Sequence, residues 1–257
     1  MGNRRLFALS DPHLSLSGAK PMHVFGPQWD GHAEKLRANW LSTVGANDVV
    51  LMPGDISWGM RLEEALPDLR WLEELPGEKV LLRGNHDYWW QSLKKMRDVG
   101  LRGMHFLQND SFALGGLAVG GSRMWDFPGI RWGFVSNADN PEVAEEKRQS
   151  PKADRAEDPE KIRAREVERL RLSLSRLPAD APVKVAMTHY PPLGEDGQRT
   201  ALTDLIGSFG IDICVFGHVH ALRDCPHPGA DITIDGTRYL LAASDYLRHA
   251  PTYLCDI

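Results

Sequence analysis

The chain has 257 residues, enough for one large domain or two small ones, and its 42% hydrophobic and 25% charged residues are typical of a globular protein. The formal net charge of −5 disfavours nucleic acid as a partner of the whole molecule. The apolar residues before Ser10 are too few for a signal peptide, and no apolar run in the sequence approaches the roughly 18 residues of a membrane span. Cys214, Cys225 and Cys255 lack paired or metal-type spacing, so we expect free thiols and a cytoplasmic protein.

The first hundred residues alternate between short apolar runs and helical periodicity, which is typical of an α/β fold. Apolar runs predict buried strands at 5–9, 49–52 and 79–82. Apolar residues three or four apart predict helices at about 29–44, 62–75 and 88–99.

After residue 111 the pattern changes. Residues 112–124 predict a hairpin with a glycine turn, and residues 125–177 form an insertion or cap-like segment, aromatic at first and then charged. Residues 142–171 hold nine acidic and nine basic side chains, a balance that favours an ion-paired surface over a nucleic-acid stripe. Asp158 and Pro159 predict the start of a helix to about residue 176. Further strands are predicted at 183–187, 211–216, 232–234, 239–243 and 252–256, with a helix at 200–209. We expect one domain over 1–257.

Five predicted strands end in polar side chains of the metal-binding type. These are Asp11 and His13, Asp55, Asn85 and His86, His189, and His218 and His220. If the strands lie side by side, these groups meet at one edge, where ligands bind in α/β sheets. Imidazole and carboxylate together suit divalent Mn, Fe or Zn. The groups are too many for one tetrahedral site, so we expect two metals, with one carboxylate bridging them.

The same residues form a series of motifs that is specific as a set. The motifs are Asp11-x-His13, Gly54-Asp55, Gly84-Asn85-His86-Asp87, His189 and Gly217-His218-x-His220. In this order they resemble the calcineurin-like metallophosphoesterases, from residue 11 to residue 220. The resemblance implies two mixed β-sheets packed face to face with helices outside, two metals at strand ends, and hydrolysis of phosphate esters.

The resemblance also implies a role for each ligand. One metal is expected to bind Asp11, His13 and His220, and the other Asn85, His189 and His218. The bridging carboxylate is then Asp55.

Two further residues follow the ligand Asn85. His86 is similar to the catalytic histidine of the family, which stabilises the phosphoryl group and protonates the leaving oxygen. Asp87 is expected to orient that imidazole.

One position departs from the family pattern. Many relatives have an acidic residue three places after the bridging aspartate, where this chain has Trp58. The departure and the missing Asp-Arg-Gly run argue against the protein-phosphatase branch.

A substrate pocket is predicted from residues beyond the strand ends. Trp58, Arg123, Trp125 and Tyr190 are its candidates, with Arg123 clamping a phosphate and an aromatic ring stacking on a base. The alternative is that these side chains pack a cap against the sheets. The histidines without motif partners are expected at the surface: His23, His32, His105, His227 and His249.

The sequence therefore predicts a dinuclear metal-dependent phosphohydrolase, active with Mn, that cleaves phosphodiesters or small-molecule and nucleotide phosphates. Two alternatives remain. One is a non-catalytic metal-binding scaffold of the same fold, which would be expected to have lost His86 or several ligands. The other is a nuclease, which the acidic balance disfavours.

Overall fold

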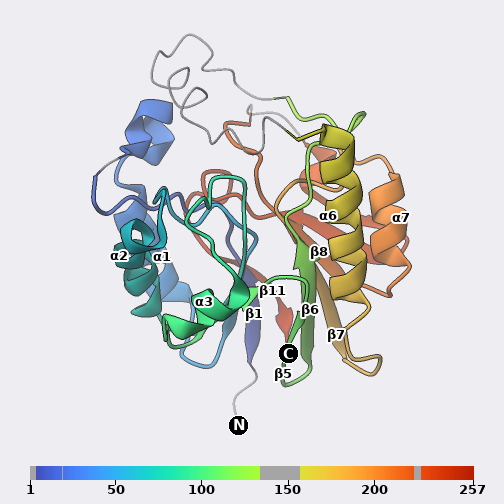
Figure 1. Cartoon of the computed structure of the whole chain (residues 1–257), viewed down its shortest axis with the longest axis horizontal. Coiled ribbons are helices and arrows are strands. Elements are labelled where there is room, and N and C mark those ends of the chain that lie inside the picture. Colours follow the sequence, from blue (N-terminus) through green and yellow to red (C-terminus); the bar gives the residue numbers. More distant parts are fainter. Residues whose placement is uncertain (1–3, 19, 134–156, 223–226) are drawn as a thin grey trace.

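The computed structural model describes residues 4–18, 20–133, 157–222 and 227–257. Figure 1 shows two β-sheets packed against each other, with helices on the two outer sides. This confirms the predicted fold class. Residues 134–156 of the predicted insertion, and Cys225, lie outside the described residues.

The first sheet has five strands, four of them parallel. In spatial order they are β11 (Thr252–Asp256), β1 (Arg5–Ala8), β2 (Val49–Met52), β3 (Glu78–Leu82) and β4 (Met104–Leu107). Only β11 runs antiparallel, beside β1. Strands β1, β2 and β3 therefore end at the same edge of the sheet.

The second sheet has six strands in mixed orientation. In spatial order they are β5 (Ser111–Leu114), β6 (Leu117–Ser122), β7 (Val183–Thr188), β8 (Ile213–Phe216), β10 (Thr237–Leu241) and β9 (Asp231–Ile234). The central strands from β6 to β10 are parallel, and the edge strands β5 and β9 are antiparallel. The β5–β6 pair is the predicted hairpin.

Helices cover the outer faces of both sheets (Figure 1). The first sheet is covered by α1 (His32–Thr43), α2 (Leu62–Glu73) and α3 (Leu93–Asp98), and the second by α6 (Pro159–Leu174) and α7 (Ala201–Gly207). Short 3₁₀ helices lie at η1 (Met22–Phe25), η2 (Pro27–Trp29) and η3 (Pro228–Ala230). The Asp158 side chain caps α6 by accepting from the Glu160 N–H, as predicted.

The alternation of side chains along each strand explains the layering. In β1, Leu6 and Ala8 enter the core between the sheets, whereas Phe7 packs with the helices of the first sheet. In β8, Val215 faces the shared core and Phe216 faces the α6–α7 side. Both faces of these strands are buried, so their sequences are continuous apolar runs.

In the first half, one strand was not predicted and one predicted helix is shorter than expected. Strand β4 was missed, and the helix expected over 88–99 is limited to α3. The Trp89 indole donates to Asp87 Oδ1 at 3.0 Å and to the Ser57 carbonyl at 3.2 Å, which holds the chain in a turn before α3. The Ser92 side chain then caps the helix.

In the part of the chain that the structure describes, none of the helices combines the length and apolar character needed to cross a membrane.

Lys79 on β3 should give the fold a measurable pH dependence. It is 1% exposed and donates to the Leu75 carbonyl, and burial lowers its pKa to about 8 from 10.5. Between these pH values the unfolded chain holds more protons, so stability should rise with pH, by about 2 kcal/mol after a discount for screening by water. Denaturant titrations of the wild type and Lys79→Met should differ in this rise. The same pH response in both proteins would contradict the prediction.

Candidate metal centre

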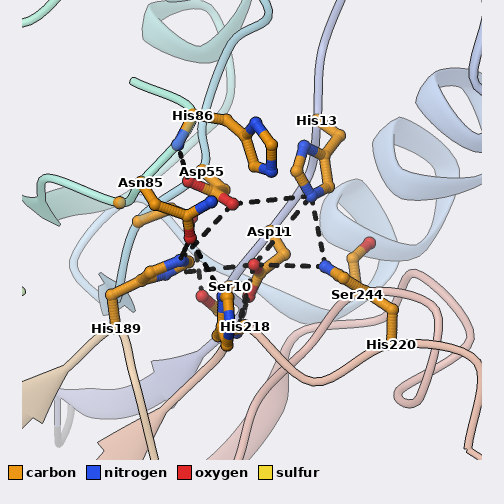
Figure 2. Close-up of polar contacts among 12 residues, drawn as sticks. Ser10, Asp11, His13, Asp55, Asn85, His86, His189, His218, His220 and Ser244 are labelled. Carbon is orange, nitrogen blue, oxygen red and sulfur yellow. Dashed lines mark hydrogen bonds and ion pairs between the residues drawn. The ribbon is translucent and has the colours of Figure 1, made fainter. Parts of the chain in front are cut away.

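The seven predicted metal ligands lie together where strand ends of the two sheets meet. Figure 2 shows their side chains pointing toward one another. Four follow β1, β2 and β3 of the first sheet, and three follow β7 and β8 of the second. The set is Asp11, His13, Asp55, Asn85, His189, His218 and His220.

Backbone hydrogen bonds between the loops fix these side chains in place. The N–H groups of Asp11 and His13 donate to the carbonyls of Gly54 and Asp55, at 3.0 and 3.1 Å. The N–H of His218 donates to both carboxylate oxygens of Asp11, at 3.1 and 3.0 Å. The loops after β1, β2 and β8 are thus tied to one another before any ligand binds.

The loops also pack so closely that two motif glycines are required. A Cβ on Gly84 would collide with the Asp55 carboxylate, and a Cβ on Gly217 with the carboxylate of Asp11. Only glycine admits the backbone this near to the site.

Four of the expected ligands adopt a left-handed backbone conformation. Asp11, His13, Asp55 and His218 have φ between 45° and 71°. Such angles are uncommon in residues other than glycine, and they concentrate at functional sites, where surrounding contacts hold them.

The first expected ligand set is tightly gathered. The Nε2 atoms of His13 and His220 are 3.2 Å apart, and Asp11 Oδ1 is 3.3 Å from His220 Nε2 and 4.0 Å from His13 Nε2. One donor atom from each of these residues lies within 4.8 Å of the other two, a spacing that could hold a metal ion.

The second expected set converges on an amide oxygen. Asn85 Oδ1 is 2.6 Å from His189 Nε2 and 2.9 Å from His218 Nδ1. A second group of donors within 4.8 Å consists of Asp11, Asp55 and His189.

Asp55 lies between the two sets. Its Oδ2 atom is 3.8 Å from His13 Nε2 and 3.4 Å from His189 Nε2. This position suits the bridging role that the resemblance implies. That role stays a prediction, as do the individual metal assignments.

The electrostatics of the pocket favour a cation. Burial lowers the pKa of His13 and His218 to about 3, so both rings are neutral at pH 7 and offer lone pairs. Burial acts to raise the pKa of Asp11, but hydrogen bonding and attraction to His220 lower it to about 2. At Asp55 the attraction of neighbouring imidazoles likewise outweighs burial. Both carboxylates therefore remain negative inside the protein.

The two remaining histidines show the same preference for positive charge. Burial acts to lower the pKa of His189 and His220, but the facing carboxylates outweigh it and raise both. The carboxylates thus favour positive charge at these two rings, which bound metal ions would supply. The residues present therefore fit two divalent cations that accept nitrogen and oxygen ligands.

Asp87 accepts hydrogen bonds from both loops at the site, the one after β2 and its own after β3. Its carboxylate accepts hydrogen bonds from the backbone N–H groups of Gly84, Asp55 and Ile56 at 2.8–2.9 Å and, more weakly, of Ser57 at 3.3 Å, and from the Trp89 indole. These contacts join the loops after β2 and β3. Asp87 thus holds the two loops together, and the orienting of the His86 ring stays a prediction.

His86 lies at the side of the cluster. Its N–H donates to Asp55 Oδ1 at 2.8 Å, and its ring centroid is 5.7 Å from that of His13 and 4.5 Å from that of Trp58. Figure 2 shows its ring turned toward the His13 side of the site. Its position beside the metal ligands is compatible with the expected catalytic role, which stays a prediction.

Three of the four predicted pocket residues form a stack on one side of the cluster. The Tyr190 ring is 4.0 Å from that of His218 and 5.4 Å from that of Trp125, and the Arg123 guanidinium carbon is 4.7 Å from the Trp125 ring centre. Tyr190 and Arg123 are 8% and 7% exposed.

Trp58 lies on the other side of the cluster. It is 6% exposed and stacks on His13 at 4.9 Å and on Phe25 at 6.3 Å, with its indole N–H 2.9 Å from the Met22 sulfur. These contacts are those of a packed wall beside the ligands. Contact with substrate stays a prediction for all four residues.

Sequence reasoning missed Asp245, which touches a ligand. Its Oδ1 is 2.8 Å from His220 Nδ1, and its Oδ2 accepts the Ala221 N–H at 2.8 Å. A signal existed, because Ser244 and Asp245 follow the apolar strand β10 as Asp55 follows β2.

Two histidines expected at the surface are not there: the His227 side chain is only 5% exposed and lies beside Trp132, and His249 is buried as well. His249, expected at the surface, is 3% exposed and lies against Ser244 Oγ at 2.8 Å and the Gln28 carbonyl at 2.9 Å.

A model of the calcineurin-like phosphoesterase family matches residues 4–222, which is most of the chain. The chain therefore belongs to the calcineurin-like phosphoesterase family. Proteins of this family are in general metal-dependent phosphoesterases with two divalent metals.

Shorter similarities link the chain to phage proteins. It is 33% identical over 78 residues to the Gene 66 protein of Mycobacterium phage L5, covering 30% of this chain and 37% of that protein. It is 45% identical over 62 residues to the Gene 66 protein of Mycobacterium phage D29, covering 24% and 29%. The chain thus spans about a third of the length of these curated relatives. A solved protein of unknown function from Aquifex aeolicus has a TM-score of 0.48, 15% identity and coverage of 98% and 96%.

Proposed function

We propose that the chain is a dinuclear metal-dependent phosphohydrolase, with Mn as its preferred activating metal, that cleaves phosphodiesters or small-molecule and nucleotide phosphates. The observation that supports this most is the convergence of the seven expected ligands from five strand ends of two sheets. Buried carboxylates at Asp11 and Asp55 need compensating positive charge, and two cations would supply it. Turn chemistry alone does not account for so many metal-type groups in one pocket.

Each ligand residue has a task in this proposal. Asp11, His13 and His220 would hold one ion, Asn85, His189 and His218 the other, and Asp55 both. When bound, the ions would bind phosphate oxygens, neutralise charge that develops during the attack and activate water.

His86 would supply the proton chemistry. An imidazole can donate a proton to a reacting oxygen, so the His86 ring suits protonation of the leaving group. The Asp55 carboxylate accepts a hydrogen bond from the His86 backbone N–H at 2.8 Å, which fixes the His86 backbone beside the ligands. No covalent bond between protein and phosphate is required.

The walls of the site would select the substrate. Trp58 and Tyr190 pack directly against ligand rings and keep water from one side of each ring. Arg123 and Trp125 extend the Tyr190 side, and we propose that this side receives the organic part of the phosphate ester.

Removing the His86 imidazole tests the proposed activity. Turnover of bis-p-nitrophenyl phosphate and p-nitrophenyl phosphate should be measured with added Mn, Fe or Zn. His86→Ala should lower turnover by about 10²- to 10⁴-fold, since general acid catalysis is lost, while the metal content stays unchanged. A panel with cyclic nucleotides, sugar phosphates and single- and double-stranded DNA would separate diesterase, monoesterase and nuclease activity.

His105→Ala is a matched control. His105 is half-exposed on β4 and pairs with Glu78 at 2.6 Å, at a distance in the fold from the strand ends that form the site. This variant should retain wild-type turnover. Metal-loaded protein that turns over no substrate, or equal rates in wild type and His86→Ala, would favour the scaffold alternative.

A further inference from the structure

Asp245 lies on a segment that joins the ends of the two sheets. After β10 the chain continues beside β1, and the Ser10 N–H donates to the Ala242 carbonyl at 2.7 Å while the Ala242 N–H donates to Phe216 at 2.7 Å. Ser10 and Ala243 form a parallel bridge. Both sheets therefore fix where the Asp245 side chain begins.

The turn that carries Asp245 is also closed on itself. The N–H groups of Leu247 and His249 donate to the carbonyls of Ala243 and Ser244, at 2.9 and 2.7 Å. The buried His249 ring lies between Ser244 Oγ and the Gln28 carbonyl. A side chain on such a turn has a defined direction, and the Asp245 side chain is only 5% exposed.

The Asp245 carboxylate fixes which nitrogen of His220 carries a proton. A carboxylate only accepts hydrogen bonds, so the His220 Nδ1 at 2.8 Å must donate. In the neutral ring this leaves the lone pair on Nε2. Nε2 is the atom 3.3 Å from Asp11 Oδ1 and 3.2 Å from His13 Nε2, inside the first ligand set (Figure 2).

In the second ligand set, the group within hydrogen-bond distance of His189 Nδ1 is a backbone carbonyl. His189 Nδ1 lies 3.0 Å from the Pro53 backbone carbonyl, and the Asn85 amide stands where the first set has the Asp11 carboxylate. An anionic partner behind an imidazole raises its basicity as a ligand more than a carbonyl does. Asp55 Oδ2 and Asp11 Oδ1 also lie 3.4 and 3.9 Å from the His189 ring nitrogens, but the carboxylate hydrogen-bonded to the ring nitrogen that turns away from the ligand atoms is a feature of His220.

We infer that Asp245 is a positioning residue that holds His220 ready to bind metal through Nε2 and makes the site of Asp11, His13 and His220 the tighter of two metal sites. This inference rests on the proposed dinuclear centre. It adds an unequal affinity of the two sites and names the residue that causes it.

Asp245→Asn separates this role from simple packing. The asparagine has nearly the same shape but one acceptor and one donor group. If its oxygen stays on the Ala221 N–H, its NH₂ faces His220 Nδ1 and favours the tautomer with the proton on Nε2, which blocks the metal. If the amide turns over, the NH₂ faces the Ala221 N–H. In this second arrangement the amide oxygen still accepts from His220 Nδ1, so the tautomer is kept, but two donors face each other and the negative charge behind the ring is lost. The first arrangement blocks the metal, and the second weakens His220 as a ligand.

The experiment is a zinc titration of metal-stripped protein against a chromophoric chelator. Wild type should take up two ions with different affinities. In Asp245→Asn the tighter event should weaken by about 10- to 100-fold and the weaker event should change little. Asp231→Asn is the matched control, because Asp231 is exposed and pairs with Arg238 on β10, and it should leave both affinities unchanged.

A second measurement needs no variant. Nitrogen NMR of the zinc-loaded wild type should show the His220 proton on Nδ1, and a proton on Nε2 would overturn the inference even if Asp245→Asn did not fold. Unchanged affinities in a folded Asp245→Asn would also overturn it and would leave the proposed function standing. A wild type that takes up no zinc would end both.

Discussion

Asp55→Asn should abolish hydrolysis, with a loss of about 10³-fold or more. The substitution keeps the shape of the side chain and the oxygen that accepts the His86 N–H, but it removes the charge between the two ligand sets. Two cations close together repel unless an anion lies between them, and a bound metal contributes several kcal/mol to catalysis. Metal content per chain and turnover of bis-p-nitrophenyl phosphate, measured on the same sample, test this.

The result requires a control for folding and for the loss of an aspartate in general. Asp235 has a left-handed backbone conformation in an exposed turn, which asparagine tolerates, so Asp235→Asn should behave as wild type. If Asp55→Asn retained two ions and full turnover, the bridging role would be refuted.

Asp87→Ala should have the largest effect on stability, about 4 kcal/mol. Its buried carboxylate accepts the backbone N–H groups of both site loops and the Trp89 indole, and alanine would leave these donors without an acceptor inside the protein. Each unsatisfied buried donor costs about 1–3 kcal/mol, partly relieved by entry of water. Urea unfolding curves of wild type and variant give the difference directly.

Two variants make this result specific. Asp87→Asn keeps one acceptor oxygen and should lose about half as much stability. Asp98→Ala removes an exposed pair with Lys94 and should change stability by less than about 0.5 kcal/mol. A change of that small size in Asp87→Ala would show that the carboxylate does not hold the loops together.

The sequence predicted most of the fold because its strands are buried on both faces. Runs such as Val49–Met52 are apolar at every position, and they stand out from the helices between them. Strand β4 is as short as β2, but the polar His105 interrupts its apolar run, so its pattern was too weak to recognise. The helix predicted over 88–99 begins only at Leu93 for another reason. The Trp89 indole donates to Asp87 and to the carbonyl of Ser57, which is distant in sequence, and these contacts keep the chain in a turn.

The gathering of the site could be predicted because its ligands are placed by strand ends. A polar residue that follows a buried parallel strand lies at the edge where the parallel strands of that sheet end, however far it is in sequence from the other ligands. The contacts behind the ligands do not follow from such a pattern. Asp245 meets His220 across 25 residues and Trp58 meets the His13 ring across a loop, and both contacts depend on side-chain directions that only tertiary packing sets.

The division of the ligands between two sheets determines when the site can form during synthesis and folding. The segment through β4 brings Asp11, His13, Asp55 and Asn85, whereas His189, His218 and His220 are added only when β7 and β8 have been made. No complete set exists until the second sheet has docked on the first. With the proposed metal centre, neither expected ligand set is complete before β8 has been made, and bound ions would then hold the two sheets together.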